Sequence, residues 1–60
     1  MDYFAMRQLR ELRELGNDMG YLTGQMRGRL DPDSYNKLYR ELNRRRESLQ
    51  NELNEHLKTL

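Results

Sequence analysis

The 60-residue chain contains no cysteine, one histidine and one proline. Without cysteine it cannot form a disulfide framework, and a single histidine excludes a local zinc cluster of the usual kind. Disulfides and structural metals are the common stabilising devices of domains this small. We therefore expect no metal or other cofactor, and we expect self-association or a partner protein to stabilise the fold.

Long hydrophobic runs and an excess of one charge are also missing. The longest uncharged stretch is MGYLTGQM, residues 19–26, whereas a membrane span needs roughly 20 apolar residues. The net charge of +1 gives no strong attraction to nucleic acid or to anionic membranes. The opening MDYFAM lacks the basic and apolar regions of a signal peptide. We expect a cytoplasmic protein without membrane contact.

Apolar residues recur at steps of three and four in both halves, which is typical of amphipathic helices. The spacing predicts one helix over about 3–29 and another over about 32–58. A single arginine, Arg46, interrupts the second series. The first series is Leu9, Leu12, Leu15, Met19, Leu22, Met26 and Leu30, and the second is Tyr35, Tyr39, Leu42, Leu49, Leu53, His56 and Leu60.

A turn at 29–32 separates the two predicted helices. Asp31 is a good N-cap because its carboxylate can accept from free backbone N–H groups. Pro32 suits the first helical position, and Gly28 can end the first helix as a left-handed C-cap. A short turn makes neighbouring helices antiparallel. The sequence thus predicts one all-α domain over 1–60, a coiled-coil-like antiparallel two-helix hairpin.

The two apolar stripes can be paired across this hairpin from the turn to the chain ends. The pairing places Leu9 opposite His56 and brings Ala5 to Leu60. The exposed edges of the seam (Phe4, Leu38 and Leu57) then need cover. We expect either two copies to form a four-helix bundle or one copy to dock on another protein.

Glycine occurs at every fourth position between 16 and 28. Gly16 and Gly20 leave a notch beside Met19, where the pairing places Arg46. An arginine in a seam costs stability but can fix register, and Asp18 is its expected partner. The sequence therefore predicts Asp18 and Arg46 as register-setting residues.

Gly24 and Gly28 lie on the other side of the apolar stripe. A glycine inside a helix costs roughly 0.5–1 kcal/mol relative to alanine, so we expect a continuous but locally weak helix over 16–28. One alternative is a kink or frayed segment there. Another is a second helix that packs closely against Gly24 and Gly28.

Two further features are candidates for partner binding. Tyr21 lies off the apolar stripe and can anchor a partner protein. A basic cluster on the second helix can contact phosphates or an acidic protein, although Glu41 and Glu47 also allow helix-spaced ion pairs on a solvated face. This cluster comprises Lys37, Arg40, Arg44 and Arg45.

Catalytic motifs are not apparent in the sequence. Ser34 and Ser48 have no histidine at helical spacing, and GNDMG lacks the Lys-Ser/Thr ending of a phosphate-binding loop. His56 with Glu52 offers at most half of a metal site. We expect a protein that is not an enzyme.

The segment LYRELN, residues 38–43, resembles part of the small aspartyl-phosphate phosphatases of sporulation signalling. Those proteins are helical hairpins whose second helix carries a Ser-Gln-Glu-Leu-Asp motif. Glu41 and Leu42 match that motif, whereas Asn43 replaces the acidic residue associated with activity. The resemblance implies an inactive relative that docks on a helical partner.

Together these features favour binding over catalysis. We expect a small adaptor, inhibitor or regulator that binds and occludes a partner protein as a homodimer, as many accessory proteins of phages and plasmids do. The alternative is a nucleic-acid-binding dimer that uses the basic face of the second helix.

Overall fold

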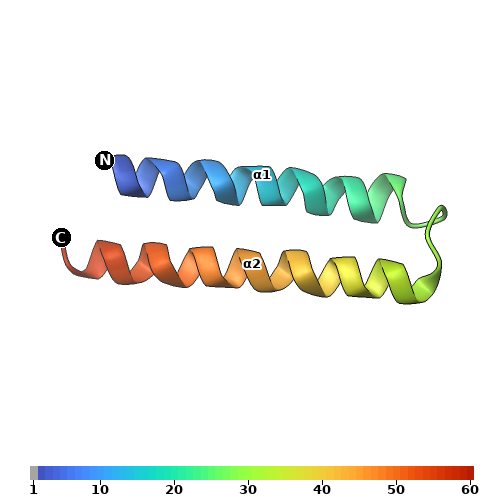
Figure 1. The fold of residues 1–60 in the computed structure, drawn as a ribbon. Helices are drawn as coiled ribbons and strands as arrows, with labels where there is room; N and C mark the ends of the chain where they lie inside the picture. Colours follow the sequence, from blue (N-terminus) through green and yellow to red (C-terminus); the bar gives the residue numbers. More distant parts are fainter. Residues whose placement is uncertain (1) are drawn as a thin grey trace.

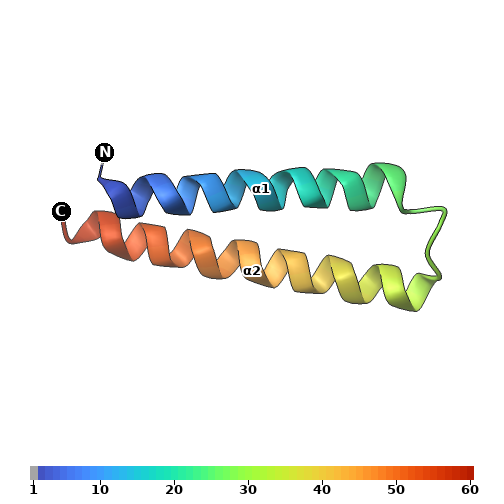
Figure 2. The same ribbon diagram turned by 45° about the horizontal axis from the view of Figure 1, so that its top comes forward.

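The computed structural model describes residues 2–60, which form two helices, α1 (Tyr3–Gln25) and α2 (Pro32–Lys58). The helices lie side by side and antiparallel, with both chain ends at one end of the molecule (Figure 1). The rotated view in Figure 2 shows their axes slightly inclined to each other. The predicted all-α antiparallel hairpin is confirmed for these residues, which measure 44 × 15 × 10 Å along the principal axes.

Both helices begin at an aspartate whose carboxylate caps the free backbone N–H groups. Asp2 accepts from the Ala5 amide at 2.9 Å, and Asp31 accepts from the Ser34 amide at 3.0 Å. Pro32 occupies the first turn of α2, where its missing donor costs nothing. The predicted start of the second helix is therefore confirmed.

The end of the first helix differs from the prediction. α1 ends at Gln25, with Met26 as its C-cap, rather than near residue 29. The Met26 carbonyl accepts from the amides of Arg29 and Leu30 at 3.0 and 3.2 Å. This turn forms without any residue at positive φ, so the prediction of a left-handed cap at Gly28 is wrong.

The glycines do not interrupt α1. Gly16, Gly20 and Gly24 all lie within one continuous helix, so the expected continuity holds as far as Gln25 and not to residue 28. Gly28 lies in the turn. The local weakness of this segment stays a prediction.

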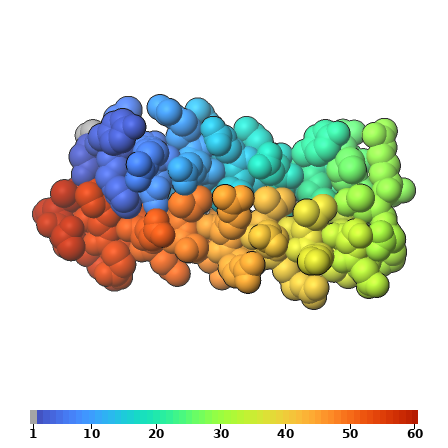
Figure 3. Space-filling model, viewed as in Figure 1, coloured from blue at the N-terminus to red at the C-terminus, as the bar shows by residue number. Residues whose placement is uncertain are grey.

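The buried core is small. Figure 3 shows the side chains of the two helices meeting along their length. Leu9, expected in the seam, is 43% exposed, and Leu60, expected against Ala5, is 76% exposed. Sequence reasoning missed the burial of Gln8, which is only 3% exposed. The buried residues are Ala5, Gln8, Leu15 and Leu22 of α1 and Leu53 of α2.

The helix pairing is shifted by about one turn from the predicted register. The Gln8 side-chain amide donates to the Glu52 carboxylate at 2.8 Å, and the Phe4 and His56 rings lie 4.5 Å apart between centroids. His56 therefore lies opposite Phe4 rather than Leu9. The shift follows from the earlier end of α1, because the longer turn moves every residue of α2 relative to α1.

Candidate protein-binding surfaces

The two helices leave a flank on either side of their seam, and the flanks differ in charge. Residues at seven-residue steps stay on one side of a two-helix coiled coil. The charged flank consists of Phe4, Glu11, Asp18 and Gln25 of α1 and Leu38, Arg45 and Glu52 of α2. The uncharged flank consists of Leu9, Gly16 and Thr23 of α1 and Asn36, Asn43, Gln50 and Leu57 of α2.

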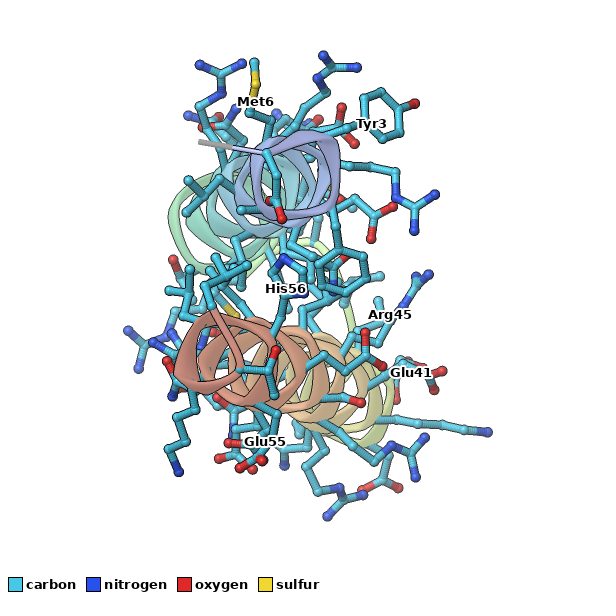
Figure 4. All side chains as sticks on the ribbon, turned by 90° about the vertical axis from the view of Figure 1, so that its left-hand side faces the viewer. Tyr3, Met6, Glu41, Arg45, Glu55 and His56 are labelled. Atoms are coloured by element: carbon cyan, nitrogen blue, oxygen red, sulfur yellow. The ribbon has the colours of Figure 1, made fainter. Side chains whose placement is uncertain are left out.

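The charged flank contains a shallow hollow of about 400 Å³ between the helices. Viewed along the helices, Arg45 and Glu41 point to this same side of α2 (Figure 4). The hollow brings three carboxylates of α1 towards one arginine of α2. Its lining residues are Glu11, Glu14, Leu15, Asp18, Arg45, Ser48 and Leu49.

Asp18 and Arg46, predicted to set the register together, are not brought together. Arg46 is exposed and donates to the Asn43 side-chain oxygen at 2.7 Å, and Asn43 donates in turn to Glu47 at 3.4 Å. Asp18 lines the charged hollow with Arg45 instead. The one-turn shift in register and the contact with Asn43 place Arg46 beside the uncharged flank.

The uncharged flank combines exposed apolar side chains with missing ones. Leu9 is 43% exposed and Leu57 is 49% exposed, and the neighbouring Tyr39 is 43% exposed. A Cβ atom added at Gly16 or Gly20 would meet nothing within 4 Å. The flank therefore has exposed apolar side chains near the chain ends at Leu9 and Leu57 and near the turn at Tyr39, with open space (the notch) over Gly16 and Gly20 of α1.

Tyr21 and Gly24, two of the other predicted partner-binding residues, are neighbours on α1, whereas the third, Gly28, lies in the turn beyond it. Tyr21 is 57% exposed. The space beyond both glycines is open. Close packing of a partner helix against them stays a prediction.

The basic residues of α2 divide into two groups. Lys37, Arg40 and Arg44 line one hollow together with Glu41, and Arg44 lies 3.9 Å from the Glu41 carboxylate. Arg45 belongs to the charged flank instead. The predicted four-residue cluster is thus a strip of three basic residues with one acid, and Arg45 lines the hollow of the charged flank.

The open end of the hairpin is joined by a contact that sequence reasoning missed. The Asp2 carboxylate, besides capping α1, lies 2.5 Å from Nε2 of His56. The Ala5 backbone N–H, followed by the hydrogen bond to His56, lowers the pKa of Asp2. An aspartate directly before a predicted helix was the available signal, because such a residue is a natural N-cap.

Residues 2–60 contain no cluster of three or more side chains suited to holding a metal ion. Neither helix of this part of the chain combines the length and hydropathy that crossing a membrane requires. Comparisons with family models, characterised proteins and solved structures find no match, so the resemblance of residues 38–43 gains no support.

Proposed function

We propose that the chain is a small non-enzymatic protein-binding module that works as a homodimer and occludes the surface of a partner protein. The supporting observation is its exposed area of 4963 Å². A compact monomer of 7.3 kDa exposes about 4,200 Å². The excess of about 800 Å² reflects the elongated shape of the single hairpin and leaves surface for a second chain to cover, about 800 Å² per partner in an interface of standard size.

The distribution of apolar side chains supports the same proposal. Among residues 2–60, four apolar residues are buried, whereas eight large apolar residues are at least 43% exposed. A core of this size gives at most about 3–5 kcal/mol of stability, so burial against a second chain adds substantially. The exposed residues are Tyr3, Met6, Leu9, Tyr21, Leu38, Tyr39, Leu57 and Leu60.

Thermal unfolding measured at several protein concentrations tests the homodimer. If folding is linked to association, the Tm rises with concentration because mass action favours the folded dimer. We expect a clear rise between low micromolar and millimolar chain. A cooperative transition with the same Tm at every concentration would contradict the proposal.

In such a dimer Tyr21 and Arg45 are proposed as anchors for the occluded partner. Exposed aromatic and arginine side chains are the residue types that most often dominate binding energy. Tyr21→Ala is expected to weaken capture of a partner without changing the Tm. A parallel loss of stability would assign Tyr21 to the fold instead.

Nucleic-acid binding is a second candidate, favoured by the strip of Lys37, Arg40 and Arg44 around one hollow. Retention on heparin and on short duplexes at physiological salt tests it. Arg40→Glu with Arg44→Glu is expected to abolish retention, whereas Arg45→Glu, on another surface, has a smaller effect. If the unmodified chain is not retained, this candidate is excluded.

A further inference from the structure

We propose that a second copy of this chain covers the uncharged flank, with the turns of both hairpins at the same end of a four-helix bundle. This inference rests on the proposed homodimer and specifies its interface. It starts from the difference in charge between the flanks. Four of the seven helical residues on the charged flank carry a charge, whereas none of the seven on the uncharged flank does.

A two-helix coiled coil in isolation has charged residues on both of its flanks. Helices of a bundle carry an additional apolar position on the side that a further helix covers, and Leu9 and Leu57 occupy this position here. Here the uncharged positions of α1 and α2 fall on the same side of the hairpin. One further pair of helices can therefore cover both at once.

The contact between Gln8 and Glu52 shows which residues of α1 and α2 lie at the same level along the hairpin. Counting turns from this contact places Gly20 level with Tyr39 and Arg13 level with Glu47. Met6 lies within one turn of the level of Leu57. In the first pair a glycine lies level with a tyrosine, and in the second a basic residue lies level with an acidic one. In the third pair both residues are apolar.

A two-fold axis parallel to the helices places α1 of one copy against α2 of the other at equal levels. Tyr39 of each copy then faces the notch at Gly20 of the other, which is empty within the single chain. Arg13 faces Glu47 at the rim. The opposite arrangement, with turns at opposite ends, brings the two Arg13 side chains together near the midpoint of α1, which like charges disfavour.

Leu57 and Leu38 give a matched pair of variants, because they lie on opposite flanks of α2 and are 49% and 46% exposed. Leu57→Glu places a carboxylate in the proposed interface and should raise the dimer Kd by about 100-fold or more. Leu38→Glu should leave it nearly unchanged. Light scattering at low micromolar concentration measures both; dissociation by Leu38→Glu, or none by Leu57→Glu, overturns the assignment.

A charge exchange tests the interface without a large change in the single chain. Among residues 2–60 no carboxylate lies within ion-pair distance of Arg13. Arg13→Glu and Glu47→Arg should each raise the Kd by about 2- to 10-fold, as expected for a rim pair. The double variant should restore it. Additive weakening in the double variant would overturn the pairing.

Spin labels in the turn distinguish the two arrangements of the bundle. With Arg29→Cys labelled in both copies, turns at the same end give a label separation of less than half the 44 Å length of the hairpin. A separation near the full length overturns the proposed axis. If the labelled and unmodified chains are both monomeric, the proposed homodimer itself fails, which is a separate result.

Discussion

The open end of the hairpin and the half next to the turn are held together differently. Polar contacts join α1 and α2 near the open end, through Gln8 with Glu52 and Asp2 with His56. In the turn half of the described residues no side-chain hydrogen bond or ion pair joins the helices. Gly16, Gly20 and Gly24 all lie in that half of α1.

This difference indicates that polar contacts stabilise the pairing of the helices at the open end, whereas apolar burial stabilises it in the turn half. Hydrogen bonds are directional, so the polar contacts at the open end hold the register that the end of α1 sets. The turn half depends on apolar burial, chiefly of Leu22 at 4% exposure, and its notch at Gly20 is open. We therefore expect a second chain to add most stability in the turn half.

Removing the Glu52 side chain, which acts at the open end, should cause the largest loss of unfolding free energy in this series. Gln8 is 3% exposed, so Glu52→Ala leaves a buried amide without its partner and should cost about 1–3 kcal/mol. Urea unfolding measures the loss. Gln8→Leu combined with Glu52→Ala should recover most of it; if the double variant is no more stable than Glu52→Ala alone, the contact does not hold this end.

The two helix caps allow a direct comparison of the ends. Asp2→Ala and Asp31→Ala each remove a capping carboxylate, but only Asp2 also contacts the other helix, through His56. We expect both variants to lower the Tm and Asp2→Ala to lower it more. Equal decreases would show that the contact with His56 adds nothing to the open end.

Alanine substitutions at two glycines sharpen the account of the turn half. A Cβ atom meets nothing at Gly24 or at Gly20 within the single chain, so each alanine should stabilise α1 by about 0.5–1 kcal/mol. In the proposed bundle Gly20 faces Tyr39 of the second copy. Gly24→Ala should therefore raise the Tm more than Gly20→Ala does; the reverse order would contradict close approach at Gly20.

Acid should weaken the N-caps of both helices, and the resulting loss of stability should be the smallest in this series. Backbone N–H groups, of Ala5 at Asp2 and of Ser34 at Asp31, hold both pKa values below the ordinary 3.8. Folding thus favours the ionised carboxylates, and their stabilisation is present above pH 3.8 and lost as the pH falls through the lowered values.

Thermal melts between pH 5 and pH 2 measure this loss, with the pH range chosen to bracket about 3.8. The variant with Asp2→Asn and Asp31→Asn keeps good N-cap residues that do not titrate. Its Tm should depend less steeply on pH in this range. An unchanged pH dependence would show that other carboxylates determine the acid response.

The sequence was sufficient for the hairpin and the second cap, because helix periodicity and the Asp31–Pro32 signal are local. The register could not be obtained in the same way. Apolar stripes with nearly constant spacing fit each other equally well when shifted by one turn, and the choice depends on where α1 ends. Backbone hydrogen bonds to the Met26 carbonyl determine where α1 ends, and no residue type in the sequence predicts these bonds.

The candidate surfaces were predicted less completely than the fold. Tyr21 and the basic strip were recognised because an off-stripe aromatic and a run of arginines are visible in the sequence. The pairing of Asp18 with Arg46 failed because it depended on the wrong register. The contrast between the two flanks required the sides of both helices to be known together, which only the folded hairpin provides.

Sedimentation equilibrium of the unmodified chain at low micromolar concentration, with helicity checked on the same sample, shows whether the folded hairpin needs a second copy. We expect a helical species of twice the 7.3 kDa chain mass that loses helicity as dilution dissociates it. A fully helical species of single-chain mass that melts cooperatively would contradict it.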